Sequence, residues 1–328
     1  MNTLIVPCAE NQYIEDDLVC VKRHPQGSFF VEQCLSSLEL NQFDSVIIAL
    51  GKTENNRFQL LERLKKELGK YKNVSIEVLP CDTKGSAETV YQVIREKKIQ
   101  GEIVIKDSTS SLVIPNDCYH KNFIIGINLS CWKDDIHDIR RKSFIKVNEQ
   151  SQVLDIIEKD VQSNIISVGM YGFKHADDYV QAYKRLNDKN YSIERLYISH
   201  IISYLIGACD KVFHFVPAIS YEEWSSRTSW MNIQKKYANY FLDLDALFGP
   251  DLDVHNCEET IRSIKRISCA GATFIAFTSH DESMKKKMKA LFAAMDIHCI
   301  QVVYGCSMSK IKRIISDEGI LKDILYNI

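Results

Sequence analysis

Thr3-Leu4-Ile5-Val6-Pro7-Cys8, near the start of the chain, is a short and mostly apolar run. A run of this length followed by polar residues is typical of a β-strand. The next hundred residues alternate similar runs with longer amphipathic segments. The sequence predicts strands over 3–8, 45–50, 74–80 and 102–106 and helices over 29–40, 56–71 and 86–97. This alternation favours an α/β fold with a mostly parallel sheet covered by helices.

A second apolar stretch late in the chain carries two aspartates two residues apart. It reads Tyr240-Phe241-Leu242-Asp243-Leu244-Asp245-Ala246-Leu247-Phe248. The spacing predicts a buried strand that ends in two carboxylates on the same face. One carboxylate could attack phosphorus while the other moves a proton to the leaving oxygen. Two solvated acids at a surface strand end are the alternative, because short motifs often match by chance.

The composition is that of a globular protein with room for two domains. The 328 residues are 45% hydrophobic and 26% charged, and the net charge is −2. This balance gives no support for a nucleic-acid partner or for membrane insertion, and no apolar stretch is long enough to span a bilayer. We expect no signal peptide, because the amino terminus lacks a basic start and a long apolar core. The eleven cysteines form no C-x-x-C pair, which favours reduced thiols in a cytoplasmic protein.

Several segments between residues 1 and 235 resemble the sugar-phosphate nucleotidyltransferases, which share the glycosyltransferase A type fold. The segments that carry the resemblance, in order, are 4–9, 27–32, 85–90, 102–107, 158–159, 168–173, 194–199 and 221–224. The resemblance implies that the segment starting at Gly85 binds a nucleotide and that Asp107 binds a metal ion. It also implies that Lys159 holds a substrate phosphate or a sugar carboxylate. A turn-capping role for Asp107 and a surface salt bridge for Lys159 are the alternatives.

The loop after the first strand departs from that family. The family has a glycine-rich loop with an arginine, because backbone amides must approach the triphosphate closely. Residues 9–17 of this chain read AENQYIEDD, with four acids and no glycine, and those acids would repel a triphosphate. Ser108 also stands where the family commonly has another acid. We therefore expect the fold to be kept and nucleotidyl transfer to be lost or altered, with an unusual substrate as the alternative.

The region from about 238 to 328 resembles the haloacid dehalogenase-like phosphohydrolases. An aspartate pair, a hydroxyl, a lysine and a final acid follow one another, and each acid or hydroxyl closes a strand-like segment. The resemblance implies that Asp243 is the nucleophile and that Asp245 is the general acid and base. Ala246 stands where the family usually has glycine.

The same resemblance assigns roles to the residues that follow. Ser279 or Thr278 would hold the phosphoryl oxygens together with Lys312, with Lys310 in reserve. Mg²⁺ would be bound by the two aspartates named above and by Asp317. The ion is needed because a phosphate dianion otherwise repels an attacking carboxylate.

Together these patterns predict an α/β protein of two domains, a nucleotidyltransferase-like domain over 1–235 and a small phosphatase-like parallel-sheet domain over 236–328. The leading hypothesis is an Mg²⁺-dependent phosphohydrolase that acts on a small phosphorylated sugar or polyol in capsule or surface-glycan precursor synthesis. The first domain would then bind a nucleotide, a sugar or a partner enzyme. A working sugar- or polyol-phosphate nucleotidyltransferase and a non-catalytic binding subunit are the alternatives. The sugar, the base and the oligomeric state stay open, a homo-oligomer included.

Overall fold

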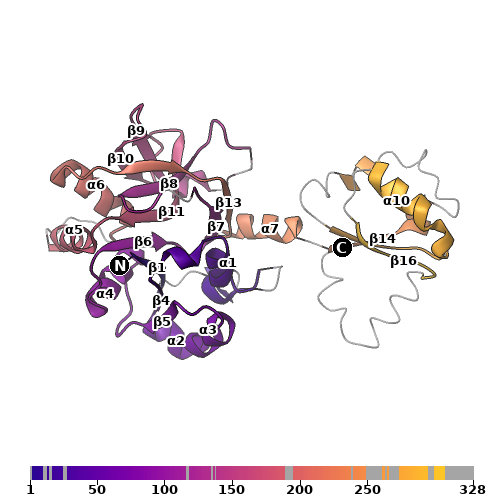
Figure 1. The fold of residues 1–328 in the computed structure, drawn as a ribbon, viewed down its shortest axis with the longest axis horizontal. Coiled ribbons are helices and arrows are strands. Elements are labelled where there is room, and N and C mark those ends of the chain that lie inside the picture. The colour runs from indigo at the N-terminus through magenta and orange to yellow at the C-terminus, as the bar shows by residue number, and fades with distance from the viewer. Residues whose placement is uncertain are drawn as a thin grey trace. The chain divides into compact units, whose positions relative to one another are not determined.

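The computed structural model separates the chain into two compact units, Met1–Trp230 and Met231–Ile328 (Figure 1). The residues that the structure describes are 2–9, 13–14, 17–24, 28–115, 118–133, 136, 138–188, 195–237, 239–248, 261–262, 264–265, 273–294 and 299–306. None of the described helices is both long and apolar enough to cross a membrane.

In the described residues, the first unit is built on a nine-stranded mixed sheet. Its strands are β1 (Asn2–Cys8), β4 (Ser45–Leu50), β5 (Val74–Val78), β6 (Glu102–Lys106), β8 (Phe123–Asn128), β9 (Ser143–Val147), β10 (Val153–Glu158), β11 (Ile165–Phe173) and β12 (His214–Pro217). The main path is β10-β9-β11-β6-β1-β4-β5, with β8 beside β11 and β12 beside β8. Strands β6, β1, β4 and β5 are parallel, as predicted, whereas β11 is antiparallel to β6, β8 and β9.

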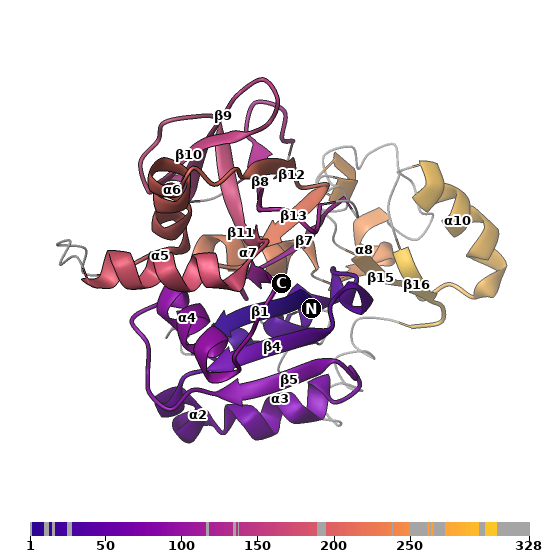
Figure 2. The same ribbon diagram turned by 60° about the vertical axis from the view of Figure 1, so that its left-hand side comes forward.

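Helices cover both faces of this sheet (Figure 2). They are α1 (Phe30–Ser36), α2 (Lys52–Phe58), α3 (Leu60–Leu68), α4 (Ser86–Glu96), α5 (Ala176–Asp188) and α6 (Ile198–Cys209). Helices α1 and α3 share one apolar core with Leu4 and Val6 of β1, and α4, α5 and α6 share the other with Ile5. Successive side chains of a strand point to opposite faces. Burial on both faces therefore explains why β1 is an apolar run without alternation.

Two helices differ from the prediction, and local hydrogen bonds explain both differences. The helix expected over 56–71 is divided at Gln59, whose φ of 52° is left-handed, and the Asn55 side chain accepts the Leu61 backbone N–H. The helix expected over 29–40 ends at Ser36 and is followed by the 3-10 turn η2 (Leu40–Gln42). The hydroxyls of Ser36 and Ser37 donate to carbonyls one turn back, which is the kind of local bond that competes with helix continuation.

Short elements surround the end of β6. They are the hairpin β2 (Tyr13–Ile14) and β3 (Asp17–Leu18), the turns η1 (Val19–Val21) and η3 (Ile139–Arg141), the antiparallel pair β7 (Ser110–Val113) and β13 (Ser220–Glu223), and α7 (Arg227–Lys236). Trp224, directly after β13, is fully buried and stacks on Phe30 at 4.7 Å between ring centroids. Its indole Nε1–H donates to the Ser108 carbonyl at 2.9 Å, and its backbone N–H donates to the Thr109 carbonyl at 2.9 Å. Trp224 therefore ties the segment after β6 to α1.

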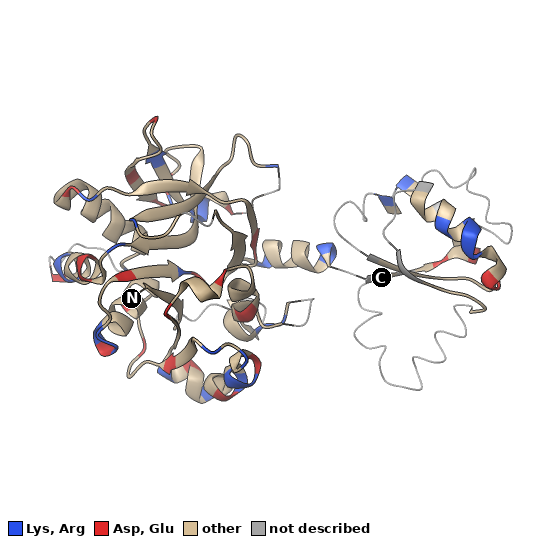
Figure 3. Ribbon diagram, in the orientation of Figure 1, with Lys and Arg blue, Asp and Glu red and all other residues tan. Residues whose placement is uncertain are grey.

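The second unit contains a parallel sheet of three described strands. Its elements are β14 (Asn239–Asp243), α8 (Leu244–Phe248), β15 (Thr273–Phe277), η4 (Glu282–Met284), α10 (Lys285–Ala294) and β16 (Cys299–Val303), and the strand order is β14-β15-β16. Leu242, Phe274 and Met288 belong to its core. Lys285 to Lys287 form an exposed basic face on α10, whereas the strands carry few charges (Figure 3).

We expect Trp224→Ala to lower the free energy of unfolding of the first unit by about 3–5 kcal/mol, because a large buried side chain is removed. Trp224→Phe can keep the stacking on Phe30 but leaves the Ser108 carbonyl without its donor, which should cost about 1–3 kcal/mol. Denaturant titration followed by far-UV circular dichroism measures both losses. Trp132→Phe is the matched control, because the Trp132 Nε1–H has no hydrogen-bond partner among the described residues. Equal losses for Trp224→Phe and Trp132→Phe would contradict this account of the indole bond.

Candidate functional site

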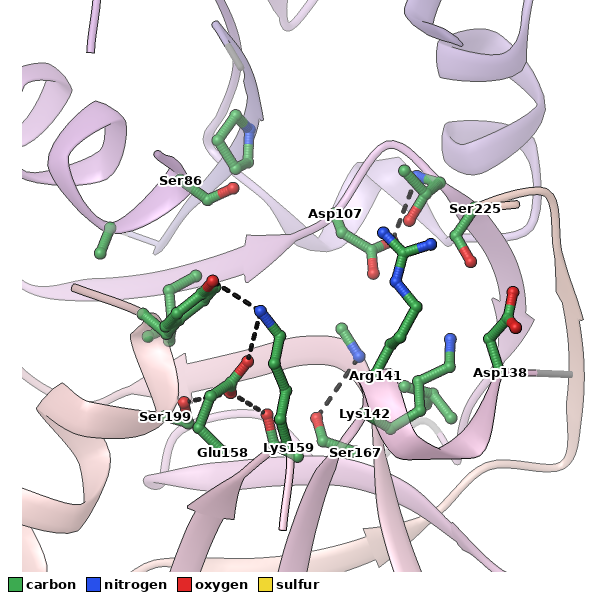
Figure 4. A pocket seen from close by; sticks show the side chains of 18 of the residues that line it. Ser86, Asp107, Asp138, Arg141, Lys142, Glu158, Lys159, Ser167, Ser199 and Ser225 are labelled. Carbon is green, nitrogen blue, oxygen red and sulfur yellow. Dashed lines mark hydrogen bonds and ion pairs between the residues drawn. The ribbon is translucent and has the colours of Figure 1, made fainter. Parts of the chain in front are cut away.

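A cavity of ≈ 590 Å³ opens at the carboxyl ends of β1 and β6, where open α/β sheets usually bind their ligands. Its walls come from the segment after β6, the start of α4, the start of β9, the end of β10, the middle of β11 and the start of α6 (Figure 4). Five basic and three acidic side chains line it: Arg141, Lys142, Lys159, Arg195, Arg227, Asp107, Asp138 and Glu158. The cavity therefore has a surplus of positive charge, which suits an anionic ligand.

Asp107 lies directly after β6, and one of its two carboxylate oxygens accepts hydrogen bonds from the protein. Its Oδ1 accepts from Lys106 Nζ at 2.5 Å, from Ser110 Oγ at 2.8 Å and from the Thr109 backbone N–H at 3.3 Å. Lys106 is fully buried, so this carboxylate also neutralises a charge that would otherwise be costly. Asp107 thus caps the turn after it, as one reading of the sequence predicted. No hydrogen bond within the described part of the chain uses Oδ2, and the side chain is 34% exposed.

Gly169 of β11 lies against the same carboxylate. The Asp107 backbone N–H donates to the Gly169 carbonyl at 2.8 Å, and the glycine has a left-handed φ of +80°. A Cβ at this position would lie 1.6 Å from Asp107 Oδ2. The register between β11 and β8 shifts between Ser167 and Met170, which places the glycine in a β-bulge. Only glycine lets the strand pass this close to the carboxylate.

Glu158 and Lys159 form another part of the cavity wall, at the end of β10. Glu158 Oε2 accepts from the hydroxyls of Ser143 and Ser199, each at 2.6 Å. Lys159 Nζ donates to Tyr197 Oη at 2.6 Å and lies 4.1 Å from the centre of that ring. Lys159 Nζ is also 3.9 Å from Glu158 Oε1. Lys159 therefore forms the predicted salt bridge and also lines the cavity. Because this side chain is held by the protein and is 44% exposed, its ammonium can meet an anion in the cavity.

Gly85 contributes to the site indirectly. The residues that line the cavity here are Ser86 and Ala87, at the start of α4, and Gly85 is the residue before them. A Cβ at Gly85 would lie 2.6 Å from Arg195 Nε, so the glycine lets that guanidinium pack on the start of the helix. Sequence reasoning assigned no role to Arg141, Lys142 or Arg227, because no motif marks them. It placed Arg195 in a segment that resembles the family but assigned no role to its side chain.

β14 ends in an aspartate as predicted, but the expectation that both aspartates of the second unit lie on one strand face was wrong. β14 ends at Asp243, whose Oδ1 accepts the Ala246 backbone N–H at 3.1 Å, and Asp245 already lies in α8. Asp245 accepts from Thr278 Oγ1 at 2.5 Å and from the Ser279 backbone N–H at 2.7 Å. Burial alone raises the pKa of Asp245, but these hydrogen bonds outweigh burial and lower the pKa below its ordinary value.

The other residues predicted for this second site lie outside the described residues. They are Lys310, Lys312 and Asp317. Within the described part of the chain, no group of three or more histidine, cysteine, aspartate or glutamate residues is arranged to hold a metal ion.

Comparison with solved structures identifies a known fold in this chain. No protein-family model and no curated protein matches the chain. A nucleoside-diphosphate-sugar pyrophosphorylase from Vibrio cholerae is 18% identical with a TM-score of 0.56, over 71% of this chain and 99% of that one. The inositol-1-phosphate CTP transferase from T. maritima is 15% identical with a TM-score of 0.52, over 69% of this chain and 90% of that one.

A third solved structure agrees with these two. It is a putative glucose-1-phosphate thymidylyltransferase from Bacillus anthracis in complex with a sucrose, 12% identical with a TM-score of 0.53, over 71% of this chain and 94% of that one. The chain contains a nucleotidyltransferase fold. This confirms the fold predicted for the nucleotidyltransferase-like part of the chain. The comparisons show neither a haloacid dehalogenase-like domain nor a link to capsule synthesis.

We expect Gly169→Ala to destabilise the first unit by at least about 1–2 kcal/mol, the cost of a left-handed conformation for a residue with a Cβ. The new methyl group must also displace the Asp107 carboxylate, so the measured loss should exceed that cost. Denaturant titration gives the change in free energy. Gly207→Ala is the control, because a Cβ there meets nothing within 4 Å and the residue lies in α6. This control should gain up to about 1 kcal/mol. A Gly169→Ala protein as stable as the wild type would contradict the close approach.

Proposed function

We propose that the nucleotidyltransferase-like unit transfers a nucleotide from a nucleoside triphosphate to a small sugar phosphate or polyol phosphate. The observation that carries this proposal is that Asp107, with an uncommitted Oδ2, and Lys159 line one cavity in a nucleotidyltransferase fold. A carboxylate suits the metal ion of a triphosphate, and an ammonium suits the phosphate of an acceptor. This reading favours transfer over phosphate hydrolysis for the larger unit.

The reaction would be an in-line displacement at phosphorus. An oxygen of the acceptor phosphate forms a bond to the α-phosphorus of the triphosphate, and the bond from that phosphorus to the bridging oxygen of the β-phosphate breaks. The electron pair leaves with pyrophosphate, so no redox partner is needed. The main barrier is the repulsion between negatively charged reactants, which positioning and positive charge reduce. Lys159, fixed by Tyr197, would hold the acceptor phosphate in line.

The residues present fit an Mg²⁺ ion. This ion is usually held by one or two carboxylates together with substrate phosphates and water. Asp107 offers Oδ2 for that purpose, because Lys106 and Ser110 hold Oδ1 and so fix the carboxylate. Bound there, Mg²⁺ would offset the charge of the phosphates and orient them.

Of the four acids in the loop after β1, Asp17 is the one among the described residues. In the described part of that loop, Tyr13 lines the cavity. Its Oη donates to Glu54 Oε2 at 2.7 Å, and this hydrogen bond is the main cause that raises the pKa of Tyr13 above its ordinary value. Tyr13 therefore adds no negative charge to the cavity wall near neutral pH.

We expect Asp107→Asn to lower kcat/KM for nucleotidyl transfer by about a hundredfold or more, because the carboxylate that would hold Mg²⁺ beside the reacting phosphates is lost. Lys159→Met should chiefly raise KM for the acceptor. The assay is pyrophosphate release from each nucleoside triphosphate with a panel of sugar and polyol phosphates, with Mg²⁺ and with EDTA. Asp160→Asn is the matched control, because Asp160 is the exposed neighbour of Lys159 and does not line the cavity. Equal rates for Asp107→Asn and the wild type would overturn the proposed role.

A second candidate function, phosphomonoester hydrolysis, belongs to the smaller unit. The observation that favours it is that Asp243 ends β14 while Thr278 follows the neighbouring parallel strand β15, which brings a carboxylate and a hydroxyl to one sheet edge. Asp243 would attack phosphorus. The lowered pKa of Asp245 keeps it ionised near neutral pH, which suits a base better than an acid. Ser279, Lys312 and Asp317 would bind phosphate and Mg²⁺ as the family resemblance implies.

If this unit is a phosphohydrolase, Asp243→Asn should abolish Mg²⁺-dependent phosphate release, because an amide cannot replace the carboxylate nucleophile. The assay is release of inorganic phosphate from the sugar and polyol phosphate panel, with Mg²⁺ and with EDTA. Glu282→Gln, an exposed acid on η4, should leave the rate unchanged. Release that survives Asp243→Asn, or no release by the wild type from any compound, would rule out this candidate.

A further inference from the structure

The positive side chains of the cavity divide into two groups by what they contact. Lys142 Nζ contacts Tyr221 Oη at 3.0 Å and pairs with Glu223, and Lys159 is held by Tyr197. Arg195 packs against Gly85 at the start of α4. The side chains of Arg141 and Arg227 are exposed, and neither makes a hydrogen bond or an ion pair within the described part of the chain.

Arg141 is directed into the cavity. It ends η3, two residues before Ser143, and Ser143 pairs with Glu158 in the β9–β10 ladder. Arg141 and Lys159 therefore leave the same end of one hairpin. Figure 4 shows the Arg141 side chain extending from there toward Asp107 and Ser225.

Within the described residues, no acidic side chain of the cavity wall forms a hydrogen bond or an ion pair with the Arg141 guanidinium. Glu158 is occupied by two serine hydroxyls, and Asp107 Oδ1 is occupied by Lys106 and Ser110. Asp138 belongs to the same turn as Arg141, but the contact between them is from the Arg141 backbone N–H to the Asp138 carbonyl at 2.8 Å. An exposed arginine on an open surface needs no explanation. Two that line one cavity beside Lys159 form a second pair of cationic groups, available to an anionic group that Lys159 does not hold.

We propose that the acceptor substrate carries a second anionic group besides its phosphate, and that Arg141 binds this group with help from Arg227. The inference rests on the proposed nucleotidyl transfer for the assignment of Lys159 to the acceptor phosphate. A guanidinium presents a planar fork of donors that matches the two oxygens of a carboxylate or of a phosphate. The substrate class is therefore an acidic sugar or polyol phosphate: a uronic or aldonic acid phosphate, or a bisphosphate.

Matched pairs of acceptors test this class. Glucose 1-phosphate, glucuronic acid 1-phosphate and glucose 1,6-bisphosphate differ in the second group, and glycerol 3-phosphate and 3-phosphoglycerate form a second series. Binding of each compound to the full chain is measured by isothermal titration calorimetry, and turnover is measured by pyrophosphate release. The proteins are the wild type, Arg141→Gln, Arg227→Gln and the control Arg140→Gln, whose exposed side chain does not line the cavity.

We expect the wild type to bind an acidic member at least about tenfold more tightly than its neutral partner, as one charge-assisted hydrogen bond allows. Arg141→Gln should remove most of this preference while leaving the affinity for the neutral member nearly unchanged, and Arg140→Gln should keep it. Preference for the carboxylate series or for the bisphosphate identifies the group.

Equal binding of acidic and neutral members by the wild type, or equal weakening of both by Arg141→Gln, would overturn the inference. Calorimetry gives this answer even if no compound is turned over. In that case the proposed transfer fails, and the binding preference still decides the role of Arg141.

Discussion

The buried ion pair between Lys106 and Asp107 is the constraint around which the site is arranged. A fully buried ammonium must be paired, and the Asp107 carboxylate lies against it and Ser110. This fixes Oδ1 toward the protein and leaves Oδ2 for the cavity. Gly169 must then lack a side chain, because the carboxylate occupies the space. The Trp224 indole N–H donates to the carbonyl of Ser108, the residue after Asp107, and so fixes the start of the turn.

The fold was largely predictable because its strands follow simple physical rules. β1, β4 and β6 are buried on both faces, so their sequences are apolar runs that periodicity detects. Helix ends were less predictable, since they depend on single side-chain hydrogen bonds. The Asn55 side chain accepts the Leu61 N–H where the predicted helix over 56–71 divides, and no apolar pattern reports such a bond. The antiparallel strands around β11 also lack a local pattern that gives their order.

Only those residues of the candidate site that lie in segments recognised in the sequence could be predicted. Asp107 follows the predicted strand over 102–106, Lys159 belongs to a segment that carries the family resemblance, and both line the cavity. Arg141 and Arg227 come from a turn and a helix start that no motif marks, so only the folded chain brings them together. For Asp243 and Asp245, the sequence pattern predicted an arrangement that the folded chain does not have. Their spacing suggested one strand face, but the chain enters α8 after Asp243, because the Asp243 carboxylate accepts the Ala246 N–H at 3.1 Å.

The central claim is that the larger unit forms a bond at the α-phosphorus of a nucleoside triphosphate. Phosphorus-31 NMR of the protein with Mg²⁺, a nucleoside triphosphate and an acidic sugar phosphate follows every phosphorus atom at once. The account predicts that the α-phosphorus and the acceptor phosphorus signals convert together into those of a pyrophosphate diester, with free pyrophosphate appearing in equal amount. Inorganic phosphate formed from the acceptor while the triphosphate stays intact would contradict the account, and so would unchanged spectra for every acceptor in the panel.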